Sequence, residues 1–471
     1  MVLTQGAKAP RVRATGAPLL TSVVLWWAAL GVVAELEGPW LDQVWPAWRW
    51  AFGAAALWGA NAALLAYGIG PPLRVSRPPI LAAGFAFAMT VLGSGSYWAT
   101  LQLYPLYRVG IERAAWFVAA CTMLALCAAV LTQRILGRFE DRPLAALSWD
   151  WPRLGAMTYV LFALAAVGTL VAIRRIGYIP ILAGDPTSAR VDFPALGGIW
   201  YRLSMLGGVV ALLVAAQGAA RRATVPLYLI GFASLCLVGL YGPRFFVALP
   251  LGVSLLLWDR FRAAISIRRV VLVVLVAAPL LGVLGHWRQR DQSATLLNPL
   301  GVLLYGALGE FRDIGWALDY YSLGDRFLHG ITLGSLVVPL LPSPVWSVLG
   351  IDKAAIYSQN SASILADAMG QTTGQRIGAY GEFFMNFGWT GTVIGALLYG
   401  ALLAYLDDRF RRVDRGDVWG VFLGLAIATT IFAQVGQLNM FTSTLTGLGY
   451  PMAFVVFVAG RRMRAASPMP A

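Results

Sequence analysis

The chain has 471 residues, of which 59% are hydrophobic and only 12% are charged, whereas about a quarter of the residues are charged in an average soluble domain. This composition argues against a soluble globular protein and indicates a chain that uses lipid as its solvent. The net charge is +14, but the basic residues lie in small groups between apolar runs and form no continuous stripe. We therefore expect a membrane protein with no nucleic-acid partner.

Apolar runs, most of them about 17 to 24 residues long, recur along the whole chain and are long enough to cross a bilayer as helices. Unsatisfied backbone groups cost several kcal/mol in hydrocarbon, so these runs are predicted to be helices rather than barrel strands. The expected fold is an all-α polytopic membrane protein with about twelve transmembrane helices. The predicted spans are residues 19–35, 50–69, 79–102, 114–134, 154–173, 200–219, 225–241, 244–258, 270–287, 389–406, 417–435 and 442–460.

Arginine-rich connections alternate along the chain with connections that hold fewer cations and more acids. By the positive-inside rule the arginine-rich set is cytoplasmic, which predicts a bacterial inner-membrane protein with both termini inside. No small-residue cleavage site follows the first apolar run, so that run is predicted to be a span rather than a signal peptide. The cytoplasmic set comprises Lys8/Arg11/Arg13, Arg74/Arg77, Arg134/Arg138/Arg142/Arg153, Arg221/Arg222, Arg260/Arg262/Arg268/Arg269, Arg409/Arg411/Arg412/Arg415 and Arg461/Arg462/Arg464.

This alternation divides the chain into three parts: residues 1–287 with spans one to nine, residues 288–388 as a large periplasmic loop, and residues 389–471 with the last three spans. The loop is too apolar to be disordered. Residues 300–321 and 331–349 are expected to form interfacial or re-entrant helices, broken by prolines in the second segment. A long hydrophobic loop of this kind indicates a chamber at the membrane surface.

The sequence lacks the motifs that several kinds of enzyme and transporter require. The chain has no GxxxxGK[ST] phosphate loop, no GxGxxG after a strand and no CxxC, which argues against nucleotide-driven transport and redox chemistry. Its two histidines, His286 and His329, offer little material for a metal site. The three cysteines lie inside apolar runs, where a thiol behaves as a small hydrophobe. We therefore expect no metal and no cofactor.

Arginines on the predicted outer face need an explanation, because the positive-inside rule disfavours cations on that side of the membrane. Many of them could snorkel to lipid phosphates. Four lie in better-defined places: Arg244 follows Gly-Pro in a tight turn, Arg288 and Arg290 leave the ninth span beside His286, and Arg376 begins a glycine-rich stretch. Guanidinium groups bind phosphate oxygens bidentately, so these four arginines are candidates for diphosphate binding.

The glycine-rich stretch before the tenth span permits close backbone approach. Within it, Glu382 and Asn386 are one helical turn apart, and Tyr380 and Asn386 are candidates to line the chamber. Glu382 is either a structural partner of Arg376 or a catalytic base. His286 is either a general base or a hydrogen-bonded helix terminus.

The stretch from Arg376 to Leu406 contains Arg-x-Gly, Gly-Glu and Asn-Phe-Gly-x-x-Gly elements. Together with the Gly242-Pro243-Arg244 turn, and with many spans around one large outer loop, it resembles the oligosaccharide repeat-unit polymerases of the Wzy-type O-antigen and exopolysaccharide pathways. The resemblance covers the organisation of most of the chain and the residues of about a tenth of it.

The resemblance implies a GT-C-like membrane glycosyltransferase that works without metal. It would transfer a growing glycan from undecaprenyl diphosphate to another lipid-linked repeat unit at the periplasmic face. Arg244, Arg288, Arg290 and Arg376 would bind the diphosphate, and Glu382 or His286 would assist the acceptor hydroxyl. The implied partners are undecaprenyl-diphosphate-linked oligosaccharide, membrane lipids, a chain-length regulator and a flippase.

Other functions remain compatible with the sequence. A polyprenyl-phosphate-dependent glycosyltransferase would take its base from the first outer loop, which holds Glu35, Glu37 and Asp42. A glycan or lipid transporter would place charges within its spans and often carries inverted repeats. A membrane O-acyltransferase could use His286. Among the outer acids only Glu310 and Asp313 have same-face helical spacing, which makes them the alternative metal site.

Overall fold

The computed structural model describes residues 48–69, 74, 76–100, 111–137, 147–183, 196–240, 244–265, 310–322, 326–341, 343–368, 376–434 and 436–462. Helices dominate this part of the chain, as the apolar composition predicts. Five of its helices are long and apolar enough to cross a membrane. They are Arg113–Leu136, Trp151–Ile176, Leu196–Ala219, Gly378–Arg411 and Asn439–Ala459.

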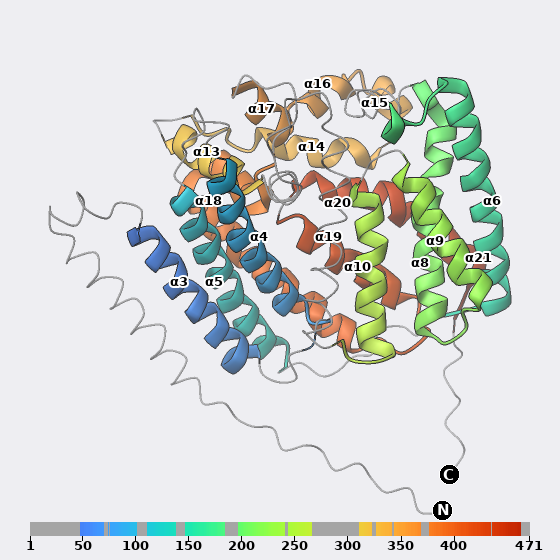
Figure 1. Cartoon of the computed structure of the whole chain (residues 1–471), viewed down its shortest axis with the longest axis horizontal. Coiled ribbons are helices and arrows are strands. Elements are labelled where there is room, and N and C mark those ends of the chain that lie inside the picture. Colours follow the sequence, from blue (N-terminus) through green and yellow to red (C-terminus); the bar gives the residue numbers. More distant parts are fainter. Residues whose placement is uncertain are drawn as a thin grey trace, which may run out of the picture.

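Helix α5 (Ile111–Leu136) is the centre of a first group of helices on one side of the bundle, at the left of Figure 1. Its neighbours α3, α4 and α18 all pack against it, and α3 continues into a π-helical turn, η1. The bounds of these elements are α3 (Trp48–Ala63), η1 (Leu64–Ile69), α4 (Pro78–Thr100) and α18 (Gly378–Arg411).

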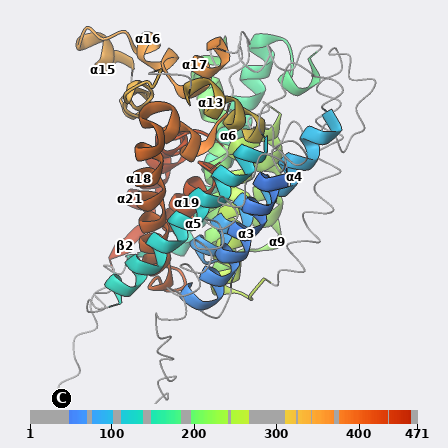
Figure 2. The same cartoon turned by 90° about the vertical axis from the view of Figure 1, so that its left-hand side faces the viewer.

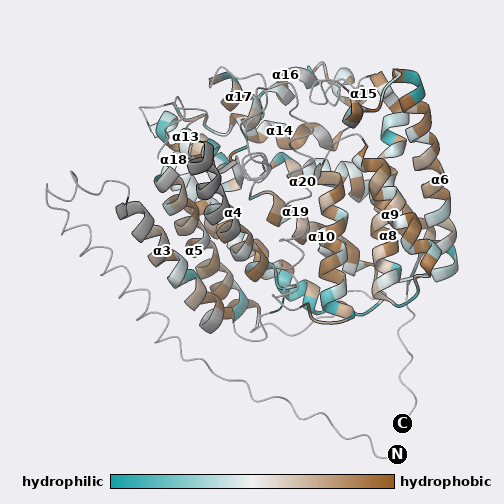
Figure 3. Cartoon of the chain, viewed as in Figure 1, coloured by the Kyte–Doolittle hydropathy of each residue, from teal (hydrophilic) through white to brown (hydrophobic). Residues whose placement is uncertain are grey.

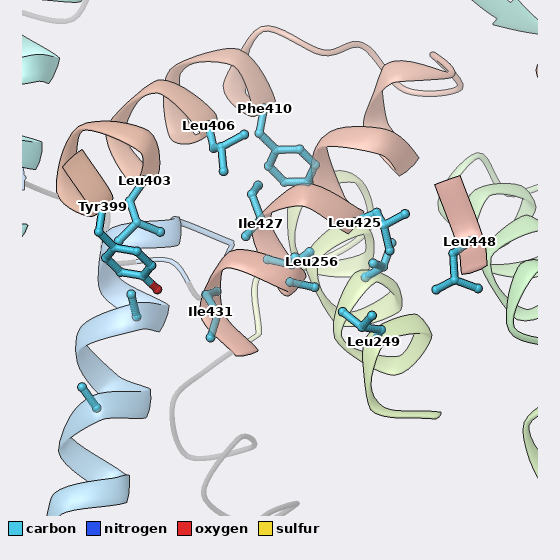
Figure 4. Close-up of a cluster of buried hydrophobic side chains, with 14 of the residues drawn as sticks. Leu249, Leu256, Tyr399, Leu403, Leu406, Phe410, Leu425, Ile427, Ile431 and Leu448 are labelled. Atoms are coloured by element: carbon cyan, nitrogen blue, oxygen red, sulfur yellow. The ribbon is translucent and has the colours of Figure 1, made fainter. Parts of the chain in front are cut away.

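Helix α8 (Leu206–Ala219) is the centre of a second group, at the right of Figure 1. The helices that pack against it are α6 (Trp151–Ile176), α9 (Val225–Gly239), α10 (Arg244–Phe261) and α21 (Tyr450–Ala459). Helix α19 (Trp419–Phe432) contacts both α10 and α18 and so joins the two groups. Figure 4 shows the apolar side chains at this junction, among them Leu256 of α10, Phe410 of α18 and Ile427 of α19, which are buried.

The bundle has two different ends. Short helices cover one end, and we call them the cap layer (Figures 1 and 2). Its elements are α13 (Glu310–Ser322), η5 (Ile331–Leu333), α14 (Gly334–Val337), η6 (Val338–Leu340), α15 (Ser343–Val348), α16 (Lys353–Ser358) and α17 (Ser361–Ala368). Below it, α20 (Asn439–Thr444) and the π-helical turn η7 (Leu445–Gly449) lead into α21.

Cations gather at the other end, which we call the arginine-rich end. The strand β1 (Leu147–Trp149) pairs there in antiparallel register with β2 (Gly460–Arg462), with Leu147 opposite Arg462. Buried Asp407 of α18 forms ion pairs with Arg77, at 3.1 Å, and with Arg411. Figure 3 shows hydrophilic residues at this end and mostly apolar helices between the two ends.

Contacts between chain segments place several arginine groups of the predicted cytoplasmic set together at this end. Arg260 donates to the carbonyl of Arg411, Arg262 donates to the carbonyl of Gly218, and Arg461 pairs with Asp150. Arginine groups that are far apart in the sequence therefore lie together at one end of the described helices. Which side of which membrane each end faces stays a prediction.

Each predicted span that falls within the described residues coincides with a helix. Runs 19–35 and 270–287 lie outside the described residues, so the total of twelve spans also stays a prediction. Large apolar side chains point away from the bundle on its outer helices, including Leu170 of α6, Phe232 of α9 and Phe457 of α21, the last 87% exposed. Such surfaces fit a helix bundle that faces hydrocarbon.

The glycine-rich stretch forms the first part of α18. The outer segment was predicted to extend through residues 288–388, with a span beginning at 389; α18 begins earlier, at Gly378, but it consists of two helices that meet at a kink at Gly388, so this division of the chain stays a prediction. The helix is interrupted at Gly388, whose φ of 63° and ψ of −153° suit only glycine. In a membrane helix small residues permit close packing, in line with the close backbone approach predicted for this stretch. At Gly400, for example, an added Cβ would lie 1.9 Å from the carbonyl oxygen of Ala125 on α5.

Candidate functional site

The start of α18 is held by the end of α19. The backbone N–H of Gly378 donates to the carbonyl of Gly436, at 2.9 Å, and the N–H of Ala379 donates to the carbonyl of Ala433, at 2.8 Å. The first N–H groups of a helix have no partner within the helix, so these carbonyls satisfy them in an apolar setting. The residues just before α18 are therefore presented from a fixed base at the cap end.

Arg376 lies at this base, and its side chain is exposed. Its backbone N–H donates to Oδ2 of Asp313, at 3.1 Å, and Asp313 is a buried carboxylate on α13. Helix α13 itself packs on α18 and α5. The sequence marked Asp313 only as half of a possible metal pair with Glu310; its contact with Arg376 is a tertiary feature that no local spacing signals. Within the described residues, no group of three or more His, Cys, Asp or Glu side chains could hold a metal ion.

Glu382 lies one turn into α18 and is only 1% exposed. Its Oε1 accepts a hydrogen bond from the Thr332 hydroxyl, at 3.0 Å, and its Oε2 accepts one from the backbone N–H of Leu438, at 2.9 Å. These donors belong to the cap layer and to the start of α20, so one carboxylate joins three segments. The hydrogen-bond partners of Glu382 are thus Thr332 and Leu438, and the choice between a structural and a catalytic role stays a prediction.

Asn386 extends the same network. Its side-chain amide donates to the Thr332 hydroxyl, at 2.7 Å, and to the carbonyl of Glu382, at 2.8 Å, while its Oδ1 accepts from the N–H of Gly330. We call Glu382, Asn386 and Thr332 the Glu382 network. All three side chains are buried, and a buried polar network with every member bonded fixes one geometry.

The break in α18 at Gly388 leaves backbone carbonyls of α18 free to accept hydrogen bonds from another segment. Because α18 is interrupted at Gly388, carbonyls in the turn before it accept bonds from outside the helix. Leu328 N–H donates to the Met385 carbonyl, at 3.1 Å, and His329 N–H donates to the Asn386 carbonyl, at 2.9 Å. The cap layer is thus attached to α18 through backbone as well as side chains.

Tyr380 is also buried, and its ring meets the ring of Tyr399 edge to face, with centroids 5.5 Å apart. Tyr380 and Asn386, the two predicted chamber residues, both lie in the packed interior. Their role as chamber residues stays a prediction.

Of the other predicted site residues, only Arg244 lies within the described part of the chain. Arg244 is the first residue of α10, and α10 ends at the arginine-rich end, so Arg244 and Arg376 share the cap end. His286, Arg288 and Arg290 lie outside the described residues. So do Glu35, Glu37 and Asp42, on which the rival glycosyltransferase reading depends.

The cap end also carries an aromatic and charged surface on α13 that the sequence did not single out. The rings of Trp316 and Tyr320 stack with centroids 4.6 Å apart, and the Arg326 guanidinium lies 4.8 Å from the Tyr320 centroid. Arg113 pairs with Asp319 at 3.1 Å, and both side chains are partly exposed. The i to i+4 spacing of the two rings was the only signal in the sequence. Burial raises the pKa of the neighbouring Tyr321 to about 12, so this phenol stays protonated at neutral pH.

The geometry at the cap end therefore comprises an exposed arginine on a fixed base, a buried carboxylate beside it and a hydrogen-bonded network beneath it. These features can bind and orient an anionic group at a membrane surface. Comparisons with protein-family models, with curated proteins and with solved structures found no match to this chain.

Proposed function

We propose that this chain is an oligosaccharide repeat-unit polymerase of the Wzy type with a GT-C-like architecture in a bacterial inner membrane. The observation that carries the proposal is the position of Arg376: an exposed guanidinium held on a rigid base at the end of an apolar bundle that is opposite the arginine-rich end. By the positive-inside rule the cap end is then periplasmic, and both termini are cytoplasmic.

The proposed reaction transfers a glycan between two lipid-linked substrates. The acceptor hydroxyl of one repeat unit attacks the anomeric carbon of the other glycan, the bond to undecaprenyl diphosphate breaks, and the hydroxyl proton passes to a base. Negative charge grows on the departing diphosphate, and preorganised arginines stabilise it most where water is excluded. Arg376 and Arg244 supply that charge in this proposal, together with Arg288 and Arg290.

The hydrogen bonds at Glu382 bear on the choice of base. Both of its oxygens are engaged, so in our proposal Glu382 positions the start of α18 beneath Arg376, and His286 is the proton acceptor. No metal takes part in this proposal. A chain-length regulator and a flippase are its expected partners, as they would control polymer length and supply the substrate.

Transport is the second candidate because α18 is a broken helix, and transporters often bind substrates or ions at such breaks. Here, however, the carbonyls of Met385 and Asn386 before the break already accept hydrogen bonds from Leu328 and His329. Each of these carbonyls thus already has a partner from the segment before η5. The break therefore supports attachment of the cap layer better than it supports transport.

The test uses full-length protein in proteoliposomes with an undecaprenyl-diphosphate-linked repeat unit. Wild-type protein should form a ladder of longer glycans and should continue to do so in excess EDTA. Arg376→Ala should slow elongation on the order of 10²-fold or more, and Arg376→Lys should not restore it because an ammonium cannot bind bidentately. Arg174→Ala, at an exposed arginine in the last turn of α6, is the matched control and should remain active.

Three results would overturn the proposal. One is inserted, monodisperse wild-type protein that never elongates the glycan. Another is full activity of Arg376→Ala. The third is a reaction that EDTA stops and Mg²⁺ or Mn²⁺ restores, which would point instead to Glu310 and Asp313.

A further inference from the structure

The edge of the cap layer exposes a cluster of large apolar side chains. We call Val337, Leu341, Val345, Val348 and Leu349 the apolar rim; all are exposed, and Val348 is 87% exposed. The rim lies in the short helical segments α14 and α15 and in the residues that follow η6 and α15, outside the helices long enough to span a membrane. Large apolar side chains exposed together within one short stretch, residues 337–349, indicate an interaction surface.

The rim is fixed in place by internal bonds. The indole N–H of buried Trp346 donates to the carbonyls of Val338 and Leu341, both at 3.1 Å. The Leu349 N–H donates to the Val345 carbonyl, at 3.1 Å. The segment therefore holds its apolar side chains outward in a defined conformation, and their exposure is not the result of a frayed helix.

The rim continues the lipid-facing side of a predicted span. Helix α21 exposes Tyr450, Phe454 and Phe457 along one candidate membrane helix. The Tyr450 hydroxyl donates to the carbonyl of Leu340, at 3.3 Å, at the point where η6 packs against η7. Figure 2 shows α15 at the edge of the layer, above α18 and α21. Tyrosine is enriched at the boundary between hydrocarbon and headgroups, because its ring is apolar and its hydroxyl is polar.

Continuity with α21 identifies the occupant of this surface. A surface that extends a lipid-facing helix, with a tyrosine at the junction, fits the bilayer itself rather than a soluble partner. The exposed polar residues that follow, Asp352, Ser358 and Gln359, lie beyond the rim in the turn before α16 and at its end. We propose that the apolar rim is an interfacial membrane anchor, inserted between the headgroups and acyl chains of the leaflet on the cap side.

This anchor would set the depth of the cap layer. Because the cap layer is bonded to α18 through the Glu382 network, anchoring the rim would hold the start of α18 at headgroup level. The diphosphate of a lipid-linked substrate lies at the same level, a consequence that rests on the proposed polymerase function. The anchor itself does not depend on that function.

The test measures the depth of single positions in full-length protein. Cys127 and Cys236 are replaced by alanine, buried Cys121 is kept, and Val348→Cys or Leu349→Cys is labelled with an environment-sensitive fluorophore. The protein is reconstituted in phosphatidylcholine vesicles with or without nitroxide on the upper part of the acyl chain. Both rim probes should lose about half or more of their fluorescence to the nitroxide. The control is Ser358→Cys, at an exposed residue on α16, and it should lose little.

Equal, weak quenching at Val348, Leu349 and Ser358 in monodisperse protein would overturn the anchor and would mean that the rim faces water or another protein. The use of two rim positions guards against one variant that folds poorly. The readout contains no glycan transfer, so a protein that fails to polymerise can still pass this test, and an active polymerase can fail it.

Discussion

Removing the carboxylate of Glu382 separates its structural role from a catalytic one. In Glu382→Ala the Thr332 hydroxyl and the Leu438 N–H both lose their acceptor in a site that is 1% exposed. A buried polar group left unsatisfied costs about 1 to 3 kcal/mol, so the two together cost about 2 to 6 kcal/mol. Against a typical folding stability of about 5 to 15 kcal/mol, this loss should detach the cap layer from α18 or unfold the protein.

Glu382→Gln has a much smaller expected effect. The glutamine Oε1 can still accept from the Leu438 N–H, and its amide can donate to the Thr332 hydroxyl, which has lone pairs for more than one donor. We expect a cost of about 1 kcal/mol or less from the changed bonds. The glutamine variant should therefore remain folded and should still polymerise glycan, while the alanine variant should lose both properties.

Thermal stability in detergent, followed by size-exclusion chromatography of the heated protein, measures the first property. The proteoliposome assay measures the second. A proton acceptor cannot be replaced by an amide, and its loss costs about 10²- to 10⁴-fold in rate. If Glu382→Gln is as stable as wild type but elongates glycan that much more slowly, then Glu382 is the base and our structural reasoning is wrong.

Three further predictions concern packing and can be checked by the same thermal assay. Gly400→Ala should destabilise the protein by about 1 to 3 kcal/mol or more, because the new Cβ would lie 1.9 Å from the Ala125 carbonyl; unchanged stability would mean that α18 and α5 are farther apart. Asp407→Ala should cost about 3 to 5 kcal/mol because it breaks the buried ion pair with Arg77, whereas Asp319→Ala, at a partly exposed pair, should cost at most about 1 kcal/mol. Gly388→Ala should cost about 1 to 3 kcal/mol, since alanine is strained at a φ of 63°; a stable variant would argue against the helix break.

The positions of the helices follow from the sequence alone. Apolar runs of membrane length have one good solution, a helix, because it satisfies the backbone without water, and the structure has helices at the runs it describes. The grouping of arginines was equally readable: Arg77, Arg260 and Arg461 are far apart in the chain, yet all lie at one end of the bundle. Successive connections between spans lie at alternate ends of a bundle, so the order of connections along the sequence can predict which arginines lie at the same end.

The candidate site could be predicted only in part. The sequence singled out the stretch around Arg376 and Glu382 as a candidate site and left the role of Glu382 open. The contacts of these residues reach across the chain: Arg376 contacts Asp313, and Glu382 contacts Thr332 and Leu438. No local spacing encodes such pairs.

The glycines of the same stretch show why local rules were insufficient. They were expected to permit close backbone approach, and in α18 both Gly378 and Gly388 have a φ of 63°, a conformation that other residues avoid. Whether a glycine breaks a helix or lets another helix approach depends on what lies beside it, as Gly400 and the Ala125 carbonyl illustrate. The sequence by itself determined which segments are helical and which ends carry charge, because these depend on local hydropathy. The tertiary structure alone decided which carboxylates are buried and bonded, because that depends on neighbours brought together only by packing.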